Sequence, residues 1–222
     1  KRQRKTGVPI TEQRVVLFGA GAAGSGVAEM LVQAMQLEGL SEADARAKIW
    51  AVDRDGLILS DVPRMPPQQV KLAHDPADIA GWNLSGSNMI TLQDTIANVK
   101  PTVLIGTSGQ KAAFDERAIR TMAEHVERPV VFPLSNPISR AEAHPADVLE
   151  WTAGKAIVGT GSPFGIAGVT QVNNVYVFPG IGLGALASGA TTVSDGMFMA
   201  AARRLGELHE GDEGLLLSLI HI

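Results

Sequence analysis

A short β-branched run, a glycine-rich turn and a helical segment near the start of the chain constrain its fold more than any other feature. Residues 14–18 read RVVLF, and residues 19–24 read GAGAAG. The first glycine permits a tight turn, the second lets the backbone approach a pyrophosphate, and the third lets the helix pack closely on the strand. The helix N-terminus also offers free N–H groups to an anion. The predicted pyrophosphate-binding residues are Gly19, Ala20, Gly21, Ala22, Ala23 and Gly24.

The next strand-like run ends at an acidic residue, which strengthens this interpretation. Residues 48–52 read KIWAV, and Asp53 follows them. A carboxylate in this place accepts hydrogen bonds from the ribose hydroxyls and repels a 2′-phosphate, so it favours NAD. Arg54 stands beside it and would offset that repulsion, which leaves NADP open. The alternative is a glycine-rich turn that only packs a helix on a sheet.

Strand-like and helical segments alternate along most of the chain. We predict further strands at residues 102–105, 129–134, 156–158 and 175–178, and helices at 41–47, 91–99, 115–125, 146–151 and 192–208. We expect residues 60–88 to be mostly loop. Strands separated by helices imply a parallel sheet covered on both faces. The predicted fold is therefore a doubly wound α/β domain of the Rossmann type, with no internal boundary in residues 1–222.

Small and polar residues follow several of the predicted strands. They are Thr107, Ser108 and Gly109 after one strand, Ser135 and Asn136 after the next, and residues 159–162 after a third. Ligands of open α/β sheets bind outside the carboxyl ends of the strands. These loops are therefore candidate binding loops, together with the glycine turn and Asp53.

Composition excludes some classes of function. The net charge of −4 argues against a surface that binds nucleic acid, and the absence of cysteine excludes disulfides and thiolate metal sites. The apolar segment from Gly180 to Gly189 is too short to span a membrane, and we expect it to pack tightly in a soluble fold. The five histidines are scattered without metal-ligand spacing, and we expect them at the surface or at helix ends.

Four segments resemble the cofactor-binding half of malic enzymes, in the same order along the chain. They are FGAGAAG at residues 18–24, PLSNP at 133–137, GSPF at 161–164 and NNVYVFPG at 173–180. The resemblance extends from about residue 9 to about residue 202. The asparagine-containing segments are far more specific than the glycine turn, which occurs in many nucleotide-binding proteins.

The resemblance implies oxidation of malate by NAD and decarboxylation to pyruvate, with Mg²⁺ or Mn²⁺ as the metal. It implies that Asn136 and Asn173 hydrogen-bond malate and that Asn174 lies beside the nicotinamide. Thr107 and Ser108 would line the nicotinamide ribose, and Gly109, Ser135 and Asn136 would complete the cofactor site with Arg54 beside Asp53. A carboxamide both donates and accepts hydrogen bonds, and it adds no charge that would oppose a developing enolate.

The metal-binding acids, the general-base lysine and the acid tyrosine of this family would precede Lys1. We therefore expect the chain to be a fragment that is inactive alone, with no catalytic or metal-binding residue of its own. We expect the full-length enzyme to be a cytoplasmic homodimer or homotetramer. Residues 165–171 look shorter than the usual connection in the family. A malolactic-type enzyme and a noncatalytic NAD-binding regulatory module are the alternative interpretations.

Overall fold

A computed structural model describes residues 7–86 and 88–208 of the chain. In these residues, seven strands form one sheet in the order β3-β2-β1-β4-β5-β6-β7. The strands are β1 (Val15–Phe18), β2 (Ile49–Asp53), β3 (Gly56–Leu57), β4 (Val103–Gly106), β5 (Val130–Pro133), β6 (Ile157–Thr160) and β7 (Thr170–Gln171). Every pairing is parallel except that of β3 with β2. The prediction of a doubly wound, mostly parallel sheet is confirmed.

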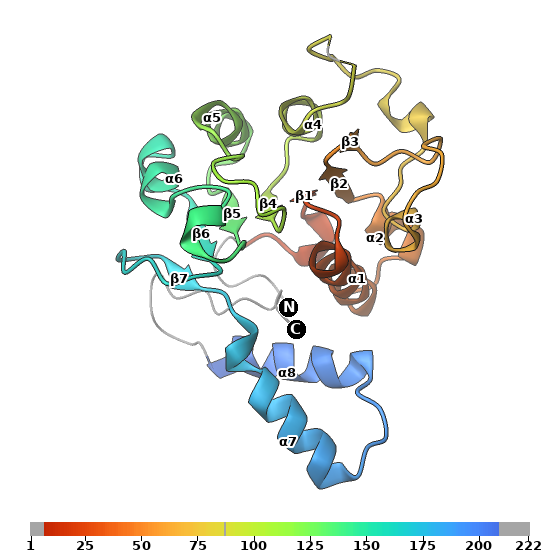
Figure 1. The fold of residues 1–222 in the computed structure, drawn as a ribbon, viewed down its shortest axis with the longest axis vertical. Coiled ribbons are helices and arrows are strands. Elements are labelled where there is room, and N and C mark those ends of the chain that lie inside the picture. Colours follow the sequence, from red (N-terminus) through yellow and green to blue (C-terminus); the bar gives the residue numbers. More distant parts are fainter. Residues whose placement is uncertain (1–6, 87, 209–222) are drawn as a thin grey trace.

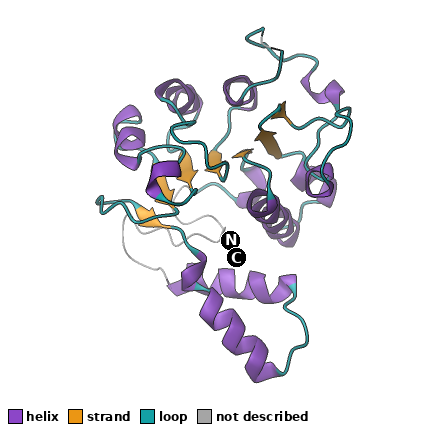
Figure 2. Ribbon diagram, in the orientation of Figure 1, coloured by secondary structure: helices purple, strands orange, loops and turns teal. Residues whose placement is uncertain are grey.

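Helices cover both faces of this sheet, as Figures 1 and 2 show. The helices of the described residues are α1 (Ala22–Leu37), α2 (Glu42–Arg46), α3 (Pro67–Val70), α4 (Leu92–Val99), α5 (Glu116–His125), α6 (Pro145–Trp151), α7 (Phe178–Ser188) and α8 (Asp195–Leu208). The part of the chain that the structure describes also contains four short 3-10 helices, at Ile10–Glu12, Pro76–Ile79, Ile138–Arg140 and Asn174–Tyr176. The region 60–88, predicted as mostly loop, contains α3 and one of these 3-10 helices.

The alternation of side chains along each strand separates the core into two layers. Val15 and Leu17 of β1 belong to the cluster that includes Val32 of α1. Val16 and Phe18 belong to the opposite cluster, which contains residues of α4, α5 and α6. Successive strand residues point to opposite faces, so a fully apolar strand requires cover on both sides. This is why the runs of β-branched residues predict a buried parallel sheet.

Capping side chains begin several helices where the sequence predicts them. Ser41 accepts a hydrogen bond from the backbone N–H of Asp44 at 3.0 Å and starts α2. Thr91 and Asp94 form a reciprocal capping box at the start of α4. Asp115 accepts from the backbone N–H of Ala118 at 2.8 Å and starts α5. Each cap satisfies an N–H group that the helix itself leaves without a partner.

The predicted strand at residues 175–178 is wrong. Asn174–Tyr176 is a 3-10 helix, and α7 begins at Phe178. The Asn173 side chain accepts a hydrogen bond from the Val175 N–H at 3.0 Å and caps this turn. Pro179 lies in the first turn of α7, where its missing N–H costs nothing. The last strand is instead β7, which pairs with β6 at Thr160 and Gln171.

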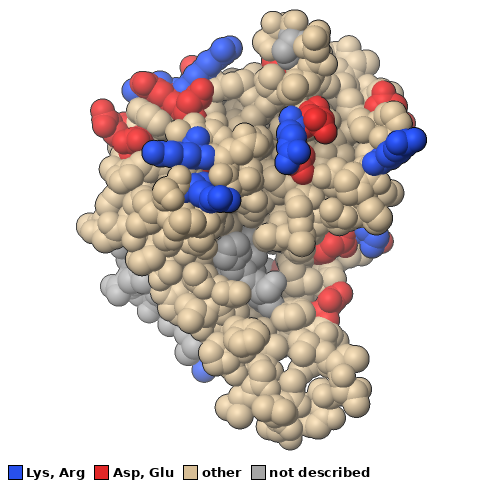
Figure 3. Space-filling view, in the orientation of Figure 1, with Lys and Arg blue, Asp and Glu red and all other residues tan. Residues whose placement is uncertain are grey.

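The apolar segment from Gly180 to Gly189 is also not packed as expected. It forms most of α7, in which no residue is buried. Leu183 is 69% exposed and Leu186 is 83% exposed. Helices α7 and α8 form a hairpin that projects from the sheet (Figure 1), and its visible surface carries few charges (Figure 3). Within residues 7–86 and 88–208, we find no helix with the length and hydropathy needed to cross a bilayer.

The histidines only partly follow the expectation. His125 lies in the last turn of α5, and His144 is the N-cap of α6. His74, in contrast, is buried, stacks on Trp50 and makes a hydrogen bond through Nε2 to the Ile49 carbonyl at 2.9 Å. His209 and His221 lie outside the described residues.

Candidate functional site

The predicted binding loops lie along one edge of the sheet, because the parallel strands are in register. Val103 of β4 aligns with Val15 of β1 and with Val130 of β5, and the alignment continues to the ends of these strands at Gly106 and Pro133. The loops that follow β1, β4 and β5 therefore start side by side. The sheet order reverses between β1 and β4, and such a switch point is where open α/β sheets bind ligands.

The glycine turn is shaped by close backbone contacts. Gly19 has a φ of +102°, and a Cβ atom there would lie 2.6 Å from the Ser108 nitrogen. A Cβ atom on Gly24 would lie 1.9 Å from the Gly19 carbonyl oxygen. Gly21, by contrast, has open space where a Cβ atom would stand, and it is the N-cap of α1 without a side-chain cap. Ala22 and Ala23 are exposed in the first turn of α1. This side of the turn is therefore open to an anion at the helix N-terminus.

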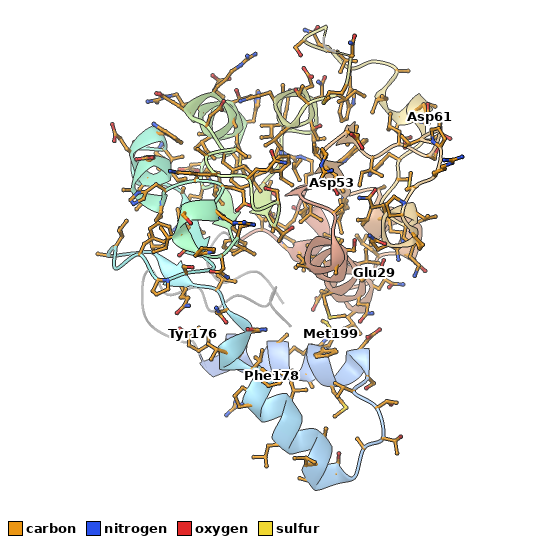
Figure 4. The ribbon with its side chains drawn as sticks, viewed as in Figure 1. Glu29, Asp53, Asp61, Tyr176, Phe178 and Met199 are labelled. Carbon is orange, nitrogen blue, oxygen red and sulfur yellow. The ribbon has the colours of Figure 1, made fainter. Side chains whose placement is uncertain are left out.

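Asp53 lies at the end of β2, beside the glycine turn (Figure 4). Its Oδ2 accepts a hydrogen bond from the Ala20 N–H at 3.2 Å and another from Gln69 Nε2 at 2.8 Å. Its Oδ1 accepts from the Arg54 N–H at 2.8 Å, while the Arg54 residue is exposed. The Asp53 carboxylate is thus held in place by the glycine turn and by Gln69.

The loop after β4 is tied to the glycine turn on one side. Thr107 Oγ1 donates a hydrogen bond to the Gly19 carbonyl at 2.7 Å. Ser108 and Gly109 follow, and both are half-buried. Their N–H groups are not directed outward, because both donate to the carboxylate of Glu142, at 2.8 Å and 3.2 Å.

The loop after β5 is bound to the same carboxylate and to the loop after β6. Ser135 Oγ donates to Glu142 Oε1 at 2.5 Å. Asn136 is exposed, accepts a hydrogen bond from Ser162 Oγ through its Oδ1, and is joined to Pro137 by a cis peptide bond. Gly161 allows this approach, because a Cβ atom there would lie 2.0 Å from the Leu134 carbonyl oxygen.

The second asparagine-containing segment, residues 173–180, reaches the same place from β7. Asn173 Nδ2 donates to the Gly161 carbonyl at 3.3 Å, and its Oδ1 accepts from the Val175 N–H. The Asn173 carboxamide thus bonds within its own loops, whereas Asn174 is exposed. The structure therefore brings Asn136 and Asn173 to the same neighbour, Gly161. In the connection at residues 165–171, Gly165 and Gly168 have positive φ. That this connection is shorter than is usual in the family stays a prediction.

Sequence reasoning missed two residues of this region, Glu142 and Gln69. Glu142 is fully buried and Gln69 is half-buried. The sequence gives a weak signal that Glu142 belongs to the site, since it is a lone acid between Ala141 and Ala143, shortly after the segment PLSNP at residues 133–137. It gives no such signal for Gln69, because Gln69 lies in a short helix of a region predicted as loop.

Other candidate places lie away from this edge. A surface hollow of about 510 Å³ is lined by Arg14, Lys48 and Trp50 among others, at the amino ends of the strands. It shares no residue with the predicted site. In the part of the chain that the structure describes, no group of three or more His, Asp or Glu side chains is placed to hold a metal ion.

A comparison with protein families agrees with this geometry. The family model described as "Malic enzyme, NAD binding domain" matches residues 1–217. The chain belongs to this family. The malic enzyme resemblance and the Rossmann-type fold that the sequence predicts are thereby confirmed.

Several curated malic enzymes are similar to the chain over most of its length. The NAD-dependent malic enzyme of Shewanella sp. (strain MR-4) is 51% identical over 211 residues, which cover 92% of this chain and 37% of that protein. The enzyme of Shewanella pealeana is 52% identical over 205 residues, covering 89% of this chain and 36% of that protein. The NAD-dependent malic enzyme of Photorhabdus laumondii is 48% identical over 227 residues, which cover 98% of this chain and 40% of that protein. The chain thus spans well under half the length of these malic enzymes.

Proposed function

We propose that the intact gene product oxidises malate with NAD and releases pyruvate and CO₂, and that this chain supplies the cofactor-binding half. The observation that carries the proposal is the gathering of the malic enzyme segments at adjacent strand ends. The four segments follow β1, β5, β6 and β7, and the loop after β4 lies between the first two of them in the sheet. The relatives at about half identity are named NAD-dependent malic enzymes, which supports the same activity here.

The residues present fit a dinucleotide. The open space at Gly21 and the uncapped start of α1 suit a pyrophosphate, and the Asp53 carboxylate suits the adenosine ribose. NAD supplies the acceptor for the hydride that leaves C2 of malate. Because Asp53 repels a 2′-phosphate, we propose NAD as the preferred cofactor.

The asparagines would bind and orient malate at the other end of the site. Asn136 is exposed at the end of β5 and has its amide nitrogen available for a carboxylate. Asn173 would have to exchange its present bond to the Gly161 carbonyl for one to malate. The main task of these asparagines would be to hold C2 of malate at near-attack distance from the nicotinamide. Correct orientation of the two reacting groups lowers the activation barrier for hydride transfer, and an uncharged carboxamide can provide it.

The metal and the acid–base groups are not assigned to this chain. The described residues contain no group of three or more His, Asp or Glu side chains placed to hold Mg²⁺ or Mn²⁺. That the metal is held mainly by residues outside this chain stays a prediction, as do the oligomeric state and the compartment.

Malate-dependent reduction of NAD⁺ and NADP⁺ by the intact gene product, with Mn²⁺ and with products identified, tests the proposal. We expect pyruvate and NADH. Lactate without net NADH would move the protein to the malolactic alternative. Tight NADH binding without turnover would leave a regulatory module.

A pair of variants separates substrate binding from general effects. Asn136→Ala should raise the KM for malate by a factor of about ten to a hundred, because a hydrogen bond to a charged group contributes about 1.5–3 kcal/mol. Asn83→Ala is the matched control, since Asn83 is exposed and bonds to Asn98 through its backbone. Equal kinetics in the two variants would contradict the role of Asn136.

A further inference from the structure

Glu142 is a buried carboxylate to which the proposed mechanism gives no role. It has no exposed surface, yet five donors converge on it. Oε1 accepts from the Ser108 N–H at 2.8 Å, the Ser108 hydroxyl at 2.9 Å, the Gly109 N–H at 3.2 Å and the Ser135 hydroxyl at 2.5 Å. Oε2 accepts from the Ser135 N–H at 3.3 Å. A buried carboxylate is tolerated only when hydrogen bonds of this kind replace its lost hydration.

The fold places this carboxylate between two strand ends. The Phe114 N–H donates to the Glu142 carbonyl at 2.9 Å, which holds the backbone of residue 142 beside the segment that follows β4. Gly106, the last residue of β4, leaves the room that the side chain needs, because a Cβ atom there would lie 2.6 Å from Glu142 Cδ. The carboxylate therefore lies against the end of β4 and bonds to the loops after β4 and β5.

An ionised carboxylate is only an acceptor, so it also determines where the serine protons point. Ser108 and Ser135 must both direct their hydroxyl protons at Glu142. Their lone pairs then face away, and the Gln110 N–H donates to Ser108 Oγ at 3.1 Å while the Gly109 N–H donates to Ser135 Oγ at 2.8 Å. A neutral amide at position 142 would present N–H groups to some of these donors and break the pattern.

We propose that Glu142 is a positioning residue, which sets the two loops that face the nicotinamide end of the cofactor and malate. The inference rests on the proposed function, because it assumes that the loops after β4 and β5 hold this end of the ligand. Glu142 itself touches neither ligand. It acts through Ser108 and Gly109 on one side and through Ser135, which precedes Asn136, on the other.

The test compares Glu142→Gln with a matched variant, Asp94→Asn, in the intact gene product. Asp94 is also a buried carboxylate, and it accepts from the N–H groups and hydroxyls of Ser85 and Thr91, none of which belongs to the proposed site. Both substitutions replace an acceptor-only group by an amide of nearly equal size. The measurements are the Kd for ADP, the Kd for NADH, kcat and KM for malate, and the melting temperature.

We expect Glu142→Gln to leave the Kd for ADP within about twofold of the original, because ADP uses only the glycine turn and Asp53. The Kd for NADH should rise, and kcat/KM for malate should fall by about a factor of ten to a hundred, since small misplacements of a reacting group have effects of this size. Asp94→Asn should lower the melting temperature without changing the ratio of the two Kd values or the kinetic constants of the folded enzyme.

The proposal is overturned if Glu142→Gln changes ADP and NADH binding equally, or changes kinetics no more than Asp94→Asn does. If Glu142→Gln does not fold, Glu142→Asp takes its place, since it keeps the carboxylate but draws it back by one methylene group from the donors of both loops. A selective loss of NADH affinity in Glu142→Asp supports the proposal, and unchanged affinity overturns it. If the original protein does not turn over malate, the proposed function fails, but the ratio of ADP to NADH affinity still decides the role of Glu142.

Discussion

The hydroxyl of Thr107 donates a hydrogen bond to the carbonyl of Gly19 at 2.7 Å, although the two residues are 88 positions apart. This bond ties the loop after β4 to the glycine turn after β1, across the switch point of the sheet. Gly24 packs against the same carbonyl from the helix side. One backbone oxygen thus fixes the strand end, the helix start and the neighbouring loop together.

Gly24→Ala should therefore disrupt the nucleotide turn. The new methyl group would lie 1.9 Å from the Gly19 oxygen, so the turn and helix α1 must move apart. We expect a destabilisation of about 1–3 kcal/mol or more by urea unfolding, together with weaker NADH binding. Gly26→Ala is the control on the same helix, because nothing lies within 4 Å of its added Cβ atom. It should stabilise the chain by about 0.5–1 kcal/mol through helix propensity. Similar effects at the two positions would contradict the packing described here.

Asp53→Ala should weaken NAD⁺ binding about tenfold and reduce the discrimination against NADP⁺. The carboxylate would no longer accept from the ribose, and it would no longer hold the Ala20 N–H of the turn. Titration of both cofactors checks this. Asp61, an exposed acid that Figure 4 also labels, provides the control, because Asp61→Ala removes the same charge away from the turn. Retained preference for NAD⁺ in Asp53→Ala would place its origin in other residues.

Acid should remove the stabilising effect of Asp94. Burial raises the pKa of Asp94, but hydrogen bonds from Thr91 and Ser85 outweigh it, so the pKa is lowered from its usual value of 3.8. A lowered pKa in the folded state means that the carboxylate stabilises the fold above about pH 3.8 and loses this effect as the pH falls through its folded pKa.

Asp94→Asn should thus cost about 1–3 kcal/mol at pH 7. The difference from the original chain should narrow at acid pH, as its own Asp94 becomes protonated. Urea unfolding at pH 7 and near pH 3 measures both values. If the difference in the free energy of unfolding stayed constant or grew at acid pH, Asp94 would stabilise the fold through its packing and not through its charge.

Leu186→Lys should have little effect on the stability of this chain, within about 0.5 kcal/mol, because Leu186 is 83% exposed on α7. Leu104→Lys, in the fully buried middle of β4, should prevent folding. Urea unfolding of the two variants compares an exposed with a buried leucine. A loss of 2 kcal/mol or more on Leu186→Lys, about the value for a buried leucine, would show that α7 is packed in solution.

Several parts of the fold and site were predictable because their signals are local. A strand of β-branched residues such as 102–105 has only one stable environment, a sheet covered on both faces. The caps at Ser41 and Asp115 act within one turn of their own helices. The glycine turn is recognised from the spacing of its three glycines between a strand and a helix. The polar residues after each strand could be placed at one edge once the strands were taken as parallel.

The sequence predictions fail where contacts between residues outside a local pattern decide the structure. Residues 175–178 have the β-branched composition of a strand, but Asn173 caps a turn and Pro179 suits a helix start. His74 is buried because Trp50 of β2 covers its ring. Helix α7 is as apolar as a core helix, yet it lies exposed in this chain. A local sequence pattern does not predict which other elements pack against a helix.

The sequence by itself determined strands β1, β2, β4, β5 and β6, helices α1, α2, α4, α5, α6 and α8, and the glycine turn, because hydrophobic period and glycine spacing act over a few residues. Only the tertiary structure decided that Glu142 joins the loops after β4 and β5, and that Gln69 holds Asp53. The physical reason is that a buried carboxylate is stable only where several hydrogen-bond donors surround it. Whether donors from two loops come close to one carboxylate depends on the register of strands whose residues lie far apart in the chain.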